Sequence, residues 1–216
     1  MPPQAGVLKV LRVGLTGGLA CGKSVVAKMF SDLGARIIYA DKIAHDLYRP
    51  GQPVYEELIK RFGHEIVKND GEIDRAKLAA IAFGNSRVEE LNKIVHPAVV
   101  RRQEQLMYEI SVREPNAVVM VEAALIFEAG VKNRFSKMVV VTCRPDQKIT
   151  RYAERACLDE AAARAEVERR GKAQLPDEDK IRRADYVIDN SGSLERTRQQ
   201  VERVYAELKT LAIAKT

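Results

Sequence analysis

The 216-residue sequence has no tryptophan, only 6% aromatic residues and three cysteines. Few aromatic side chains leave little surface for stacking nucleic-acid bases. Cys21, Cys143 and Cys157 show no paired spacing, which argues against a disulfide framework and a zinc site and favours a reducing compartment. No apolar run approaches the roughly 20 residues that cross a bilayer, and the start of the chain has no secretory pattern. We therefore expect a cytoplasmic protein without a membrane segment.

The balance of charge is basic, with a net charge of +6 and a pI of about 9.2. Such a balance favours anionic partners, although many proteins are mildly basic without functional consequence. Between residues 144 and 183 the basic side chains alternate with Asp and Glu, so they form no uninterrupted patch for a nucleic-acid backbone. We expect an anionic small molecule and no nucleic-acid partner.

Short apolar runs alternate with helical patterns along the chain, which predicts an α/β fold with a mainly parallel sheet. Helical periodicity is present in the segments between the runs, and Ser193 is expected to cap the last helix. The predicted strands are 8–15, 36–39, 117–121, 137–141 and 186–188, and the predicted helical segments are 23–33, much of 42–114, 146–172 and 193 to about 208.

Residues Gly17–Ser24 have the pattern glycine, four residues, glycine, lysine and serine, between a predicted strand and a predicted helix. The glycines let successive N–H groups turn toward phosphate oxygens, and the start of the helix adds further donors and a positive dipole end. In such loops the lysine reaches the β- and γ-phosphates and the serine hydroxyl binds Mg²⁺. The candidate ATP-binding residues are Gly17, Gly18, Ala20, Cys21, Gly22, Lys23, Ser24 and Val25.

Cys21 occupies one of the variable positions of this loop, although a thiolate would be favoured at the start of a helix. The loop predicts a bound triphosphate but does not identify the acceptor. A GTPase would need Asn-Lys-x-Asp, and Asn92-Lys93-Ile94-Val95 lacks the aspartate. A small-molecule kinase needs an acid near the acceptor hydroxyl.

Asp41 directly follows the predicted second strand, where ligands collect in parallel sheets, so it is the candidate catalytic acid. An aspartate here could also cap the following helix, a role that is compatible with catalysis. Glu122 follows the predicted strand 117–121, where it would either bind Mg²⁺ or support the loop backbone. Arg151 and Arg155 share a helix face and could clamp the phosphates together with Lys23, or form a solvated surface.

The combination of motifs resembles the dephospho-CoA kinase family over nearly the whole chain. The resemblance lies in the loop and in Ala40–His45, Pro50-Gly51, Ile94–Pro97, Leu125–Glu128, Gln174–Pro176 and Ala184–Gly192. It implies transfer of the γ-phosphoryl group of ATP to the ribose 3′-hydroxyl of dephospho-CoA. Two positions depart from the usual family pattern: Tyr39 replaces an aspartate, and Ala124 replaces a proline.

The resemblance also implies roles for residues and segments. Asp41 would be the base, His45 and His96 would be neighbours of dephospho-CoA, and structural roles for the two histidines remain open. The chain would be one kinase unit, monomeric or weakly oligomeric. Its core would be about 8–41, 115–145 and 184–216, with a substrate-binding insertion at about 42–114 and a lid at about 146–180. The alternatives are a nucleoside or nucleotide kinase of the same architecture and a nucleotide-binding regulatory or nucleic-acid-associated ATPase.

Overall fold

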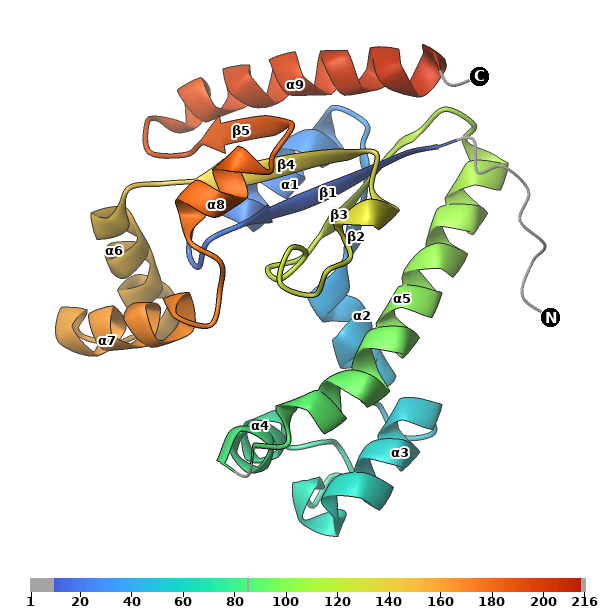
Figure 1. The fold of residues 1–216 in the computed structure, drawn as a ribbon, viewed down its shortest axis with the longest axis vertical. Coiled ribbons are helices and arrows are strands. Elements are labelled where there is room, and N and C mark those ends of the chain that lie inside the picture. Colours follow the sequence, from blue (N-terminus) through green and yellow to red (C-terminus); the bar gives the residue numbers. More distant parts are fainter. Residues whose placement is uncertain (1–9, 85, 215–216) are drawn as a thin grey trace. The chain divides into compact units, whose positions relative to one another are not determined.

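The computed structural model describes residues 10–84 and 86–214. Contacts divide the chain into two compact units, one formed by residues up to 38 and from 107 onward, the other by residues 39–106. Figure 1 labels the elements. They are β1 (Leu11–Gly17), α1 (Lys23–Asp32), β2 (Arg36–Tyr39), α2 (Ala40–Leu47), α3 (Pro53–Phe62), η1 (His64–Ile66), α4 (Arg75–Gly84), α5 (Val88–Arg113), β3 (Val118–Glu122), η2 (Lys132–Arg134), β4 (Lys137–Thr142), α6 (Pro145–Ala156), α7 (Glu160–Gly171), α8 (Asp177–Arg182), β5 (Tyr186–Asp189) and α9 (Leu194–Ala214).

The described residues form a five-stranded sheet in the order β2-β3-β1-β4-β5. The pairs β1–β3, β1–β4 and β4–β5 are parallel, which confirms the predicted α/β fold. Central strands of such sheets are covered on both faces and therefore have continuous apolar runs. Accordingly, all residues of Val118–Val121 in β3 and Met138–Val141 in β4 are buried.

Helices α1 and α9 pack together and both contact β1 and β3. The buried residues of α9 recur every three or four positions, as expected for a helix that covers a sheet with one face: Thr197, Val201, Val204, Leu208 and Ala212. Ser193 accepts a hydrogen bond from the Arg196 N–H at 3.2 Å, so its predicted capping role is confirmed. The predicted end of the helix near residue 208 is wrong, because α9 continues to Ala214.

The predicted helical segment 146–172 consists of two helices, α6 and α7, which pack against each other. Cys157 ends α6 in the left-handed conformation, with φ 52°. Asp159 then caps α7 by accepting a hydrogen bond from the N–H of Ala162 at 2.8 Å. The predicted bounds of β2 and the predicted starts of β4 and β5 are confirmed, and the remaining strand boundaries differ from the predictions by one to three residues. Positions 8, 9, 215 and 216 of the predicted core lie outside the described residues.

The second unit is helical and has its own hydrophobic core. It contains α2, α3, η1, α4 and the first part of α5, and its short connections include an antiparallel bridge between Val67 and Ile73. The buried core residues come from α3, η1, α4, α5 and the bridge, and Ala44 and Leu47 of α2 pack against them: Val54, Tyr55, Leu58, Phe62, Ile66, Ile73, Leu78, Ala82, Val95 and Ala98. The unit therefore holds its own helices together by apolar burial.

Candidate active site

The phosphate-binding loop, residues 17–24, joins β1 to α1. A Cβ atom on Gly17 would lie 2.2 Å from the carbonyl oxygen of Val141, so no larger residue fits there. Gly22 has φ +85°, a conformation that residues with a side chain rarely adopt. Gly22 is also the N-cap residue of α1, so the first N–H groups of the helix lie at the loop. These are the strand, turn and helix start that the motif requires.

Lys23 extends along the loop. Its Nζ donates hydrogen bonds to the carbonyl oxygens of Gly17 at 3.2 Å and Gly18 at 3.1 Å. The next two residues, Ser24 and Val25, are exposed on the first turn of α1. On the other side of the loop, Leu19 and Ala20 pack against a cluster from α6 and α7 that includes Ile149, Tyr152 and Ala163. The loop is thus attached to the α6–α7 hairpin (residues 145–171) by apolar contact.

Asn190, directly after β5, is hydrogen-bonded to the loop. Its Nδ2 donates to the carbonyl oxygen of Cys21 at 2.9 Å, and its Oδ1 accepts from the hydroxyl of Thr197 at 3.0 Å. Asn190 is only 3% exposed, so neither bond can be replaced easily by water. Its backbone N–H donates to Thr142 at 2.8 Å, which ties the same residue to the end of β4.

Arg151 and Arg155 of α6 lie in different surroundings. Arg151 is half-buried, and its Nη2 donates to the carbonyl oxygen of Asn190 at 3.0 Å. Its buried Nη1 has no hydrogen-bond partner among the described residues and lies 3.9 Å from where a Cβ on Gly22 would be. Arg155 is exposed, with its guanidinium 5.2 Å from the ring centroid of Tyr152. Of these two arginines, Arg151 has the guanidinium nitrogen that lies near the loop without a partner in the described part of the chain.

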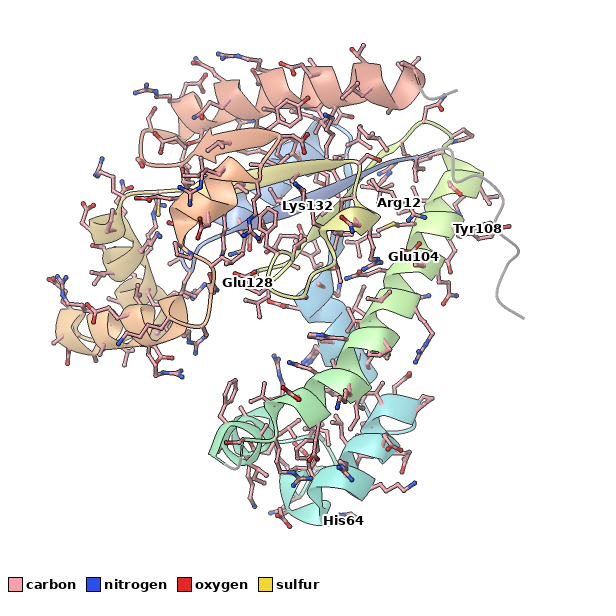
Figure 2. The ribbon with its side chains drawn as sticks, in the orientation of Figure 1. Arg12, His64, Glu104, Tyr108, Glu128 and Lys132 are labelled. Carbon is pink, nitrogen blue, oxygen red and sulfur yellow. The ribbon has the colours of Figure 1, made fainter. Side chains whose placement is uncertain are left out.

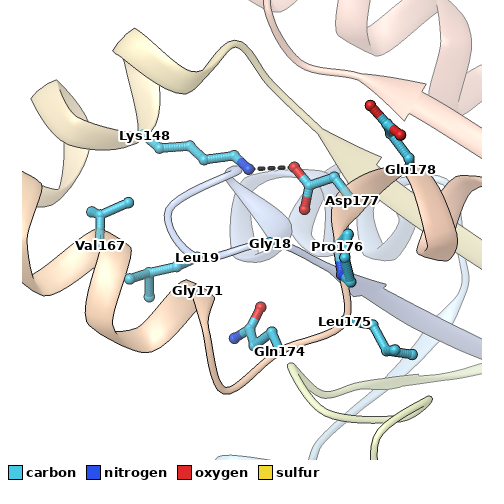
Figure 3. Close-up of a pocket in the computed structure, with 10 residues that line it drawn as sticks. All are labelled: Gly18, Leu19, Lys148, Val167, Gly171, Gln174, Leu175, Pro176, Asp177 and Glu178. Atoms are coloured by element: carbon cyan, nitrogen blue, oxygen red, sulfur yellow. Dashed lines mark hydrogen bonds and ion pairs between the residues drawn. The ribbon is translucent and has the colours of Figure 1, made fainter.

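A cavity of about 330 Å³ lies between the loop, the hairpin and the start of α8 (Figure 3). Lys148 forms an ion pair with Asp177 at its edge, and both side chains lie beside Gly18. Burial acts to lower the pKa of Lys148, but the hydrogen bond from Lys148 to Asp177 and the negative groups nearby outweigh it and raise the pKa. Lys148 is therefore a charged ammonium next to the phosphate-binding loop.

A second ion pair fixes the segment that leads into α8. Glu128 lies on the stretch between β3 and β4 (Figure 2), and its Oε1 is 3.1 Å from Nζ of Lys180, which is fully buried. The same Nζ donates to Oε1 of Gln174 at 2.9 Å, and Glu128 also accepts from the N–H of Leu175 at 2.8 Å. These contacts engage Glu128 in holding the 174–180 segment.

The candidate residues, Glu122 and Ser24, would supply only a small part of the ligands of a magnesium ion. Glu122 ends β3 and pairs in register with Leu15 of β1, so it lies on the strand next to the one that leads into the loop. Ser24 offers an exposed hydroxyl at the start of α1. Among residues 10–84 and 86–214, no group of three His, Cys, Asp or Glu side chains is arranged to hold a metal. The exposed Ser24 hydroxyl at the start of α1 suits Mg²⁺, which commonly takes one or two protein ligands together with substrate phosphates and water.

Two of the three cysteines, Cys21 in the loop and Cys143 after β4, are buried and in no disulfide. The Cys143 side chain lowers the pKa of Cys21 to about 7, with help from Lys148 and Lys23 and against the effects of burial and Asp177. Cys21 and burial together raise the pKa of Cys143.

Asp41, His45 and His96 belong to the second unit. Asp41 is exposed in the first turn of α2, whose N-cap residue is Tyr39, so Asp41 does not itself occupy the capping position. His45 is exposed on the same helix, with Nδ1 3.3 Å from Nη1 of Arg75. His96 is exposed within α5, just before Pro97.

Comparison with known proteins identifies the group to which this arrangement belongs. The family model for dephospho-CoA kinase matches residues 11–196. The chain belongs to the dephospho-CoA kinase family. A dephospho-CoA kinase of Aquifex aeolicus is 42% identical over 198 residues, which cover 91% of this chain and 97% of the relative. One from Geobacillus kaustophilus is 42% identical over 193 residues, covering 88% and 93%.

Solved structures agree with this assignment. The protein TT1252 of Thermus thermophilus has a TM-score of 0.75 and 34% identity, with 92% of this chain and 97% of that chain covered. Dephospho-CoA kinase from Campylobacter jejuni has a TM-score of 0.60 and 26% identity, with 93% and 98% covered. The predicted resemblance is confirmed, and as a member of this family the chain is an ATP-dependent kinase with an alcohol acceptor.

Three contributors to the site of this kinase were not among the predicted residues: Lys148, Asp177 and Asn190. Lys148 lies three residues before Arg151 on α6, so helical spacing alone could have indicated that it shares a face with Arg151. Asn190 is 169 residues from its partner Cys21, and no local pattern predicts such a bond. Within the described part of the chain, no helix is long and apolar enough to cross a membrane.

Proposed function

We propose a division of labour for the dephospho-CoA kinase reaction, in which the γ-phosphoryl group of ATP passes to the ribose 3′-hydroxyl of dephospho-CoA. The phosphate-binding loop holds ATP, and Asp41 accepts the proton of the attacking hydroxyl. The observation that carries this proposal is the complete strand–loop–helix arrangement around Gly22 and Lys23. Its N–H groups and ammonium suit a triphosphate better than any other common ligand.

Lys23 and Arg151 supply the positive charge on the nucleotide side. The Lys23 ammonium is held by two loop carbonyl oxygens, so it is already positioned when phosphate oxygens enter. Arg151 has a buried guanidinium nitrogen near Gly22 that has no hydrogen-bond partner within residues 10–84 and 86–214, and phosphate oxygens would satisfy it. Both cations stabilise charge that develops on the transferring group. Arg155, stacked beside Tyr152, joins them in our proposal only when the hairpin closes.

ATP is used with Mg²⁺, for which Ser24 is the proposed direct ligand and Glu122 the proposed neighbour. Bound Mg²⁺ neutralises phosphate charge during transfer. The remaining binding residues of the loop contribute backbone N–H groups and close packing, and they are Gly17, Gly18, Ala20, Cys21, Gly22 and Val25.

The helical insertion at about 42–114 is the proposed binding region for dephospho-CoA, with His45 and His96 as contacts. Both are exposed on helices of the second unit, and His45 is accompanied by Arg75, which adds positive charge for an anionic substrate. The segment at about 146–180 is the proposed lid, because its hairpin packs directly on Leu19 and Ala20 of the loop. We infer a cytoplasmic enzyme that is monomeric or weakly oligomeric.

A coupled ADP-release assay tests the proposal. Protein, ATP and Mg²⁺ are mixed with dephospho-CoA and, in parallel, with adenosine, AMP or pantetheine phosphate. We expect turnover with dephospho-CoA. Turnover with adenosine and none with dephospho-CoA would contradict the proposed acceptor. Lys23→Ala should lower the rate of transfer by roughly 100-fold or more, since it removes a preorganised cation. Full activity of that variant would refute the role of the loop, and Lys28→Ala, which changes an exposed lysine on the same helix, is the matched control.

A further inference from the structure

A loop ion pair, formed by Lys148 of α6 and Asp177 at the start of α8, lies against Gly18 of the phosphate-binding loop. A Cβ atom on Gly18 would lie 2.8 Å from an Asp177 carboxylate oxygen and 3.1 Å from the Lys148 Nζ. The Asp177 and Lys148 side chains are only 30% and 16% exposed, so salt and water screen their charges only in part. A carboxylate thus lies directly against a loop whose N–H groups are suited to anions.

Gly18 lies at the end of the loop that would receive the outer phosphates of a nucleotide. In loops of this kind the lysine reaches the β- and γ-phosphates. That lysine is Lys23, and its Nζ donates hydrogen bonds to the carbonyl oxygens of Gly17 and Gly18 at 3.2 and 3.1 Å. Gly22, at the opposite end of the loop, begins α1. The Asp177 carboxylate is therefore beside the part of the loop where the terminal phosphate of ATP would lie.

Both members of the loop ion pair can be reached by a ligand. Gly18, Lys148 and Asp177 are among the residues that line the cavity of about 330 Å³ between the loop, the hairpin and α8. Figure 3 shows Lys148 extending from α6 to meet Asp177 at this cavity. A phosphate group that enters the cavity therefore meets a positive and a negative side chain, which compete for each other and for the new charge.

Other contacts hold the walls of the cavity in place. The segment that carries Asp177 is anchored by the ion pair between Lys180 and Glu128, at 3.1 Å. On the other side, α6 is anchored by Gln147, whose Nε2 donates to the carbonyl oxygen of Ser191 at 2.9 Å. Neither contact involves the loop ion pair. Its two side chains can therefore separate and take new partners while the backbone on both sides keeps its position.

We propose that Asp177 competes with the terminal phosphate of ATP for Lys148, and that Lys148 changes partner from this carboxylate to the phosphate when ATP binds. A terminal phosphate carries about −1.5 to −2 charge at neutral pH, against −1 on a carboxylate, so it attracts the ammonium more strongly. Asp177 then turns away from the loop, because its charge repels the phosphates. Lys148 is thus a further binding residue for the transferring group, and Asp177 lowers the affinity of the site for nucleotide. The inference rests on the proposed role of the loop in holding ATP.

The test measures, by calorimetry with Mg²⁺, the binding of ADP and of β,γ-imido-ATP, an analogue that keeps a group in the γ position but does not transfer it. Asp177→Asn should raise the affinity for the analogue about 10-fold, and that for ADP less, because Lys148 no longer has to leave a charged partner. Glu178→Gln is the matched control, since it removes a neighbouring carboxylate that lines the same cavity, and it should change both affinities by less than about twofold. Lys148→Met should lower the affinity for the analogue about 10-fold more than that for ADP. Asp177→Ser replaces the asparagine variant if melting curves show that the latter does not fold.

Three results would overturn the inference. If Asp177→Asn binds the analogue no more tightly than the parent protein, the carboxylate does not compete with phosphate. If Glu178→Gln strengthens binding as much as Asp177→Asn, any loss of negative charge suffices and no change of partner occurs. If Lys148→Met lowers both affinities equally, Lys148 does not contact the terminal phosphate. A parent protein that binds neither nucleotide would refute the proposed function together with this inference, whereas normal transfer to dephospho-CoA with any of the three results refutes the inference alone.

Discussion

Replacing Asn190 by alanine should loosen the phosphate-binding loop and destabilise the whole fold. The change removes the Nδ2 donor of the Cys21 carbonyl oxygen, at 2.9 Å, and the acceptor of the Thr197 hydroxyl, at 3.0 Å. An unsatisfied buried carbonyl costs about 1–3 kcal/mol, and a lost neutral hydrogen bond about 1 kcal/mol. The Thr197 hydroxyl keeps the Ser193 carbonyl oxygen as a second acceptor at 3.3 Å. We therefore expect a total loss of about 2–4 kcal/mol in the free energy of unfolding.

The functional effect is separable from the loss of stability. Asn190→Ala releases the backbone of Cys21 within the loop, so ADP should bind roughly 10-fold more weakly, which corresponds to about 1.4 kcal/mol. Thr197→Val is the matched control, because it breaks the bond to Asn190 Oδ1 and leaves the bond to Cys21 in place. It should lower stability with little effect on ADP affinity. Urea unfolding and calorimetry measure the two quantities, and an Asn190→Ala protein that matches the parent in both would refute the reasoning.

Five further substitutions test two ion pairs and the proposed base. Lys180→Met leaves the buried Glu128 carboxylate without its cation, so urea unfolding should show that the free energy of unfolding falls by about 3–5 kcal/mol. Adding Glu128→Gln should recover part of this stability. An unchanged free energy of unfolding would contradict a buried ion pair. Lys148→Met exposes the loop to the Asp177 carboxylate and should weaken ADP binding about 10-fold, whereas Asp177→Asn should strengthen it. If calorimetry shows that both variants change ADP affinity in the same direction and by the same amount, the ion pair acts only as a structural link. Asp41→Asn should lower kcat roughly 100-fold in the ADP-release assay while ADP affinity is kept, and an unchanged kcat would exclude Asp41 as the base.

The sequence predicted those features whose causes are local. The loop required a fixed set of residue types, and buried parallel strands required continuous apolar runs, so both could be found without a structure. The end of α9 was missed because its last buried residue, Ala212, is too small to stand out as part of an apolar face. The position of the break between α6 and α7 was not predicted, because Cys157 adopts a left-handed conformation that glycine or asparagine usually occupies.

The contacts that support the site depend on residues far apart in the chain. Lys180 lies among charged residues in the sequence and would be expected on a surface, yet it is fully buried. Its ammonium forms an ion pair with Glu128 and donates a hydrogen bond to Gln174. Asn190 belongs to a motif that the family resemblance included, but its bond to the loop required the folded sheet. Contacts between distant residues, rather than local sequence preferences, account for the burial of Lys180 and for the hydrogen bond from Asn190 to the loop.

The most direct test of the account is to identify the product formed from ATP and dephospho-CoA. Phosphorus NMR and mass spectrometry, with authentic coenzyme A as the reference, locate the transferred group. We predict a new phosphomonoester on the ribose 3′-oxygen, formed by the parent protein and nearly absent with Lys23→Ala. A phosphate at another position, or no product in a reduced protein that binds ADP normally, would contradict it.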